Sequence, residues 1–174
     1  MQTLFYPFEL ESSDIDIELG LHIMKQHLRK HDALRVIKTW CNSWATSARM
    51  HEHTLLPCLF GCQDAQDEMA HYVQRPFWLY LLTKLIHQPQ PSPEPLTRLG
   101  LVEPSIPCLL AVSCSFAGYH AVKRLALEKA FTGSPLEQDV VAFCHRTFFD
   151  AFCAAARDCS FHCSGFSSLI WELT

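Results

Sequence analysis

The chain has 174 residues, which suits one ordinary domain, or one domain with a small appendage, and is long enough to bury a substantial core. Hydrophobic residues make up 49% of the chain and charged residues 18%, which argues against intrinsic disorder. We expect the chain either to hide much of its apolar surface in a protein partner or to be poorly soluble alone. The formal net charge of -4 argues against broad, nonspecific attraction to nucleic acid, although it leaves room for a local basic face.

The first residues, MQTLFYPFELESSDIDIELG, carry five acidic side chains and lack the basic start and apolar run of a secretory leader. The chain has nine cysteines, an odd number. We therefore expect an intracellular, reducing compartment, cytoplasm or nucleus, in which cysteines are buried small hydrophobes or metal ligands rather than disulfides.

Helical spacing of apolar residues predicts an N-terminal pair of helices, or one bent helix. The first stripe is formed by Ile17, Leu21, Met24 and Leu28. After a break near His31 and Asp32, a second stripe is formed by Leu34, Ile37, Cys41 and Trp44. The spacing of Trp40 and Trp44 beside this stripe favours core packing over the stacking of bases.

Basic residues follow acidic ones along this pair of helices. The candidate nucleic-acid-binding residues are Lys25, Arg29, Arg35, Lys38 and Arg49. A solvated helix face explains the same order, because acids first and bases last suit the helix dipole. The acidic total charge favours this simpler interpretation.

Three candidate zinc ligands, Cys58, Cys62 and His71, lie in the stretch HTLLPCLFGCQDAQDEMAHYVQRPFWLYLL. Zinc prefers four ligands drawn from thiolate and imidazole, and a turn that supplies two cysteines lowers the entropy cost of assembling them. Gly61, between the cysteines, can take the positive φ that a tight turn requires. His71 falls on a short helix that we expect to begin at Asp64.

The fourth ligand position, near residue 75, holds Arg75, which stays protonated and cannot coordinate a metal. Three outcomes are open. His53, or with less support His51, completes the site; the metal keeps three protein ligands and a water; or no metal binds and the cysteines are buried thiols in a packed segment.

The run over residues 34–82 resembles the zinc-binding segment behind the polymerase domain of non-LTR retrotransposon reverse transcriptases, and is most similar to retroelement-derived reading frames of dinoflagellate algae. Cys58, Cys62, His71 and Tyr72 match the family pattern, and Arg75 stands where the family has its last cysteine. The resemblance implies a non-catalytic fragment with a degenerate, CCHC-like zinc knuckle that contacts RNA or DNA. The alternative is a helical structural or protein-interaction module that binds neither metal nor nucleic acid.

No enzymatic activity is expected. A polymerase needs paired aspartates for two metal ions, and the chain has no Asp-Asp pair. It also lacks a phosphate-cradling glycine loop, a nucleophile elbow and a Cys-x-x-Cys redox motif.

A further helix is predicted from Pro76, with an apolar stripe formed by Trp78, Leu81, Leu82 and Leu85. We expect residues 88–104 to be a linker. The Pro-rich stretch HQPQPSPEP begins at His87 and runs into this range, and proline removes backbone donors. The chain is thereby divided into an N-terminal unit, 1–87, and a C-terminal unit, 105–174.

The C-terminal unit is predicted to be a helical hairpin. Its first helix carries a stripe of Ile106, Leu109, Val112, Phe116, Tyr119 and Val122, and we expect a buried core helix rather than a membrane span, because Lys123 and Arg124 follow at once. Its second helix follows a capping box of Ser134, Pro135 and Glu137, and its inward stripe is Leu136, Val140, Cys144, Phe148, Ala151 and Ala155. A second candidate metal cluster is Cys153, Cys159, His162 and Cys163. The predicted fold class is all-α.

Overall fold

The computed structural model describes residues 15–53, 55–75, 94–128 and 137–160. Helices make up 65% of these residues and no strand occurs among them, which confirms the all-α prediction. The helices are α1 (Ile17–His27), α2 (Lys30–Trp40), α3 (Met69–Gln74), α5 (Pro95–Arg98), α6 (Ile106–Glu128) and α7 (Gln138–Ser160).

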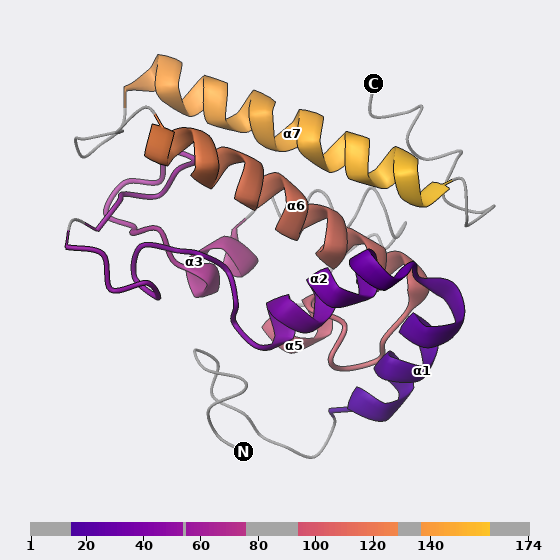
Figure 1. Cartoon of the computed structure of the whole chain (residues 1–174). Helices are drawn as coiled ribbons and strands as arrows, with labels where there is room; N and C mark the ends of the chain where they lie inside the picture. Colours follow the sequence, from indigo (N-terminus) through magenta and orange to yellow (C-terminus); the bar gives the residue numbers. More distant parts are fainter. Residues whose placement is uncertain (1–14, 54, 76–93, 129–136, 161–174) are drawn as a thin grey trace.

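Helix α6 is the centre of the fold, packed between α7 and α2 (Figure 1). The two long helices α6 and α7 run antiparallel side by side, as the predicted hairpin requires. They approach closely at Gly118, where an added Cβ would lie 2.9 Å from a ring carbon of Phe148. Every residue of the predicted α6 stripe except Ile106 is buried in one cluster with Cys144, Phe148 and Ala155 of α7.

By length and composition, α6 is the one described helix that is apolar enough to cross a membrane. However, 72% of its most apolar window is buried inside the protein. The core helix of a soluble protein passes the same composition test, and the packing of α6 against α7 and α2 agrees with that interpretation.

The break between the N-terminal helices falls at Leu28 and Arg29, earlier than predicted, because α1 ends at His27 and α2 begins at Lys30. Asp32, expected at the break, lies in the first turn of α2 and is 1% exposed. Its carboxylate accepts hydrogen bonds from Arg29 Nε at 2.8 Å, Arg35 Nη1 at 3.2 Å and Ser113 Oγ of α6 at 3.1 Å.

This anchored carboxylate gives α2 a different inward face from the predicted one. The buried residues of the helix are Asp32, Val36, Thr39 and Trp40. Leu34 and Ile37 are instead 49% and 37% exposed, and Cys41 is exposed too. Trp44 is buried as predicted. The large exposed hydrophobic residues of the described chain are Leu19, Leu21, Leu34, Ile37, Met50, Leu55 and Leu127.

The second part of the predicted linker belongs to the core. Leu96, Leu99 and Leu101 are at most 4% exposed, and Leu99 accepts a 2.8 Å hydrogen bond from the indole Nε1 of Trp40. Residues 94–104 therefore do not separate two units in the described part of the chain, whose buried residues form one cluster from Met24 to Cys159.

Several predictions concern residues outside the described ranges. They are the helix from Pro76, the Pro-rich stretch as far as residue 93, Ser134 and Pro135 of the capping box, and His162 and Cys163 of the second cysteine cluster.

Candidate metal centre

The segment with the candidate ligands folds into a narrow hairpin that leads into α3. The Cys58 N–H donates to Ala65 O at 2.8 Å, and the Asp67 N–H donates to Leu56 O at 2.9 Å. Between these bonds, Gly61 has a φ of +78°, as its place in the turn predicted, and Asp64 has a φ of +57°. The predicted helix start at Asp64 is wrong: a left-handed residue turns the chain there, and α3 begins at Met69.

The fold brings the three predicted ligands together. One ligand atom each from Cys58, Cys62 and His71 lies within 4.8 Å of the others. Ligands about 2.3 Å from a tetrahedral zinc are roughly 3.5–3.8 Å apart, so side-chain movements of about 1 Å would close the site on an ion. Cys58 is buried, while Cys62 and His71 are half-buried.

Backbone amides of the turn face the sulfur of Cys58. Burial raises the pKa of this thiol, while hydrogen bonds from the backbone amides of Cys62 and Phe60 and the charge of Arg75 act in the opposite direction. Because a coordinating metal deprotonates a thiol outright, these amides would stabilise the ligand form of the sulfur.

His71 offers the neutral imidazole that a metal requires. Burial, and next the nearby Arg75 guanidinium, lower the pKa of His71. Its Nε2 atom is shielded from solvent and has no hydrogen-bond partner among the described residues. A buried ring nitrogen without a partner costs free energy, and a metal bond would remove that cost. The donor set and this orphaned nitrogen therefore fit a soft or borderline divalent ion such as zinc.

Arg75 lies at the side of the cluster where the fourth ligand was expected. Its Nη1 is 3.7 Å from Cys58 Sγ, and its Nη2 donates to Phe60 O at 3.0 Å. His53, proposed as a fourth ligand, is exposed and is not a member of the ligand group, and His51 is exposed as well. Among the described Cys, His, Asp and Glu side chains, the group has three members.

Helix α7 also reaches the cysteine turn. His145 Nε2 lies 3.3 Å from Phe60 O, the carbonyl that Arg75 also contacts, and the His145 ring meets the Phe60 ring edge-on at 5.4 Å. The side chain of Val141, one turn earlier, packs over Gly61. Sequence reasoning missed this contact because the two segments are far apart along the chain.

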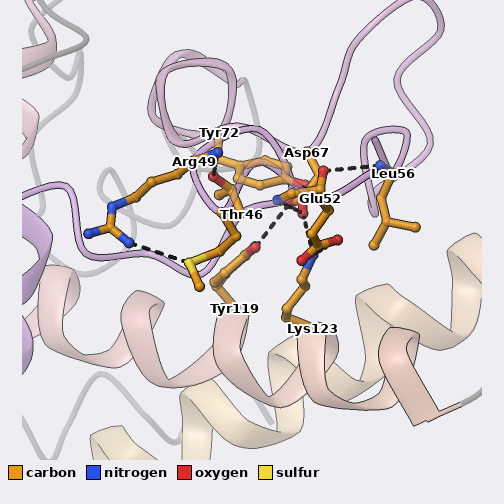
Figure 2. Close-up of polar contacts among 10 residues, drawn as sticks. Thr46, Arg49, Glu52, Leu56, Asp67, Tyr72, Tyr119 and Lys123 are labelled. Carbon is orange, nitrogen blue, oxygen red and sulfur yellow. Dashed lines mark hydrogen bonds and ion pairs between the residues drawn. The ribbon is translucent and has the colours of Figure 1, made fainter. Parts of the chain in front are cut away.

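A buried polar network, which the sequence analysis did not predict, holds the cysteine hairpin of residues 56–67 on α6 (Figure 2). Asp67 is 0% exposed and accepts hydrogen bonds from the hydroxyls of Tyr72 at 2.8 Å and Tyr119 at 3.0 Å. Lys123 Nζ lies 3.0 Å from Asp67 Oδ2 and 3.1 Å from Glu52 Oε1. The available signal was the four-residue spacing of Tyr119 and Lys123, which puts a charge on the buried face of α6 and calls for a buried carboxylate.

The predicted nucleic-acid-binding residues divide into two groups. Arg29 and Arg35 bind the buried Asp32 carboxylate, so their guanidinium groups have a structural partner. Lys25, Lys38 and Arg49 have exposed side chains. The exposed members of the predicted set therefore lie on separate elements: Lys25 on α1, Lys38 on α2 and Arg49 in the segment after α2.

Comparison of the chain with protein-family models, with curated proteins and with solved structures found no match.

Proposed function

We propose that this chain is a zinc-binding helical module in which Cys58, Cys62 and His71 hold one metal ion. The observation that carries the proposal is the convergence of two sulfurs and an imidazole nitrogen within 4.8 Å, with His71 Nε2 buried and unpartnered among the described residues. The ion would join the cysteine turn to α3 and so stabilise a segment that has only short regular structure of its own.

Metal content measures this proposal directly. The full chain, purified without added zinc and analysed by plasma mass spectrometry, is expected to contain one zinc per molecule, and Cys58→Ser, Cys62→Ser and His71→Ala are each expected to lose it. Cys41→Ser and His22→Ala are matched controls, because both residues are exposed and lie outside the cluster. Equal zinc in the ligand variants and the controls would refute the site.

Nucleic-acid contact is the second candidate function, supported by the resemblance to the retroelement zinc-binding segment and by the exposure of Lys25, Lys38 and Arg49. Anisotropy of labelled single-stranded RNA and DNA at increasing salt would measure it. A triple alanine variant is expected to flatten the slope of log affinity against log salt by about 0.7 for each phosphate that it no longer neutralises. Lys30→Ala is the control, because Lys30 is exposed and outside the set.

A further inference from the structure

Two buried polar atoms beside the cluster lack partners among the described residues. They are Nε2 of His71 and Nε of Arg75, and both are shielded from solvent. Their chemical requirements differ: a neutral imidazole nitrogen can coordinate a metal, whereas a guanidinium N–H can only donate to an acceptor. A metal ion alone would satisfy His71 and leave Arg75 Nε without an acceptor.

The other contacts of Arg75 hold its guanidinium beside the ligands. Nη1 faces Cys58 Sγ at 3.7 Å, Nη2 donates to Phe60 O at 3.0 Å, and the guanidinium carbon lies 5.4 Å from the centre of the Phe60 ring. A side chain held at three points has little freedom to swing away when an ion enters. Arg75 is therefore a fixed part of the site.

The charges of the site also favour an additional acceptor beside Arg75. Within the group formed by Cys58, Cys62, His71 and Arg75, the two thiolates would neutralise a divalent ion and the half-buried Arg75 guanidinium would leave one positive charge. Glu68, whose charge acts on His71, is exposed to solvent. One small monoanion would neutralise the positive charge that Arg75 leaves. It would also complete a four-ligand shell around zinc, which three protein ligands leave open.

We infer that the site takes a small exogenous monoanion, which coordinates the metal at its fourth position and accepts a hydrogen bond from Arg75. This inference rests on the proposed zinc site. In this inference, Arg75 binds the anion that serves as the fourth ligand, at the position where a cysteine ligand was expected. The ligand class is a monoanion that coordinates through one nitrogen, oxygen or sulfur atom and fits beside Cys58.

Cobalt substitution tests the inference with a visible signal. The full chain is loaded with Co²⁺, and thiocyanate is titrated while the thiolate-to-cobalt charge-transfer and d–d bands are recorded. A saturable change in the d–d bands is expected. Arg75→Gln is expected to weaken thiocyanate binding by at least about tenfold, because the charge-assisted hydrogen bond is removed, while the charge-transfer band remains. Arg49→Gln, an exposed arginine outside the cluster, is the matched control.

The outcomes separate the two proposals. No charge-transfer band in the unchanged chain would refute the metal site itself. A charge-transfer band with d–d bands that thiocyanate does not alter would overturn the anion site, and a response that then emerges in His145→Ala would assign the fourth position to His145. Equal thiocyanate affinity in Arg75→Gln and the unchanged chain would also overturn the role of Arg75.

Discussion

Lys123 of α6 and Asp67 of the hairpin form an ion pair inside the protein, with Lys123 Nζ 3.0 Å from Asp67 Oδ2 and side chains 3% and 0% exposed. The pair joins residues 56 positions apart in the chain. A charge this deeply buried persists only when a partner and further hydrogen bonds replace its hydration. Tyr72, Tyr119 and Glu52 supply those contacts, so the network fixes the hairpin against α6.

Removing one member of this pair is expected to destabilise the fold strongly. Asp67→Asn leaves the Lys123 ammonium without its fully buried partner, and the free energy of unfolding is expected to fall by about 3–5 kcal/mol. Urea unfolding followed by circular dichroism measures the change.

Two further variants control for this effect. Arg124→Ala removes an exposed pair with Glu128, at 3.9 Å, and is expected to change stability by about 0–1 kcal/mol. Asp67→Asn combined with Lys123→Met is expected to cost less than the sum of the single changes, since neither charge is then left alone. Additive losses would mean that the two residues do not interact.

The two tyrosines of the network are expected to differ in importance. The Tyr72 hydroxyl donates to Asp67 at 2.8 Å and accepts from the Leu59 N–H at 3.3 Å, whereas the Tyr119 hydroxyl donates to Asp67 at 3.0 Å. Tyr72→Phe therefore leaves a buried amide as well as a carboxylate lone pair unsatisfied. We expect losses of about 1–3 kcal/mol for each variant, larger for Tyr72→Phe. Equal urea midpoints, or a lower midpoint for Tyr119→Phe, would contradict this order.

Local sequence patterns predicted the features of the fold that depend on neighbouring residues, and they did not predict contacts between distant segments. Periodicity predicted the long helices and the burial of Trp40 and Trp44, and the spacing of the cysteine turn and His71 predicted the three ligands that converge, because these features depend on local sequence. Periodicity predicted the wrong buried face of α2, because the inward face is set by Asp32, which binds Ser113 of α6 in a contact between distant segments. Proline content predicted a linker, whereas Leu96, directly after Pro95, packs in the core together with Leu99 and Leu101.

Gly61 is expected to be intolerant of a side chain for two independent reasons. Its φ of +78° would cost an alanine about 1–2 kcal/mol, and the new Cβ would lie 2.8 Å from Val141 Cγ1 of α7. Gly61→Ala should therefore lower both stability and zinc content. Adding Val141→Ala should relieve the contact but not the backbone strain, so it should restore only part of the loss. Full recovery in the double variant would mean that the backbone conformation is unimportant.

Acid is expected to destabilise the chain below about pH 6.5, because the usual pKa of a histidine side chain is about 6.5. Burial lowers the pKa of His71, His120 and His145 in the folded state. Folding therefore favours their neutral forms, and this contribution is present above pH 6.5 and is lost as pH falls through the lowered values. Urea midpoints of the metal-free chain should decline from neutral to acid pH, and His120→Gln should reduce the decline. A midpoint independent of pH would contradict these lowered values.

Replacing Arg75 tests whether this position controls metal affinity. Arg75→Cys removes a positive charge beside Cys58, 3.7 Å from its sulfur, and introduces a third thiolate as the fourth ligand, where the resemblance places a cysteine. Arg75→Ala removes the charge alone. We expect Arg75→Cys to bind zinc at least about tenfold more tightly than Arg75→Ala in competition with a chromogenic chelator, because a complete set of protein ligands needs no outside donor. Its cobalt form should also cease to respond to thiocyanate. Equal affinities for the two variants would mean that residue 75 cannot reach the ion, since the same charge is absent from both.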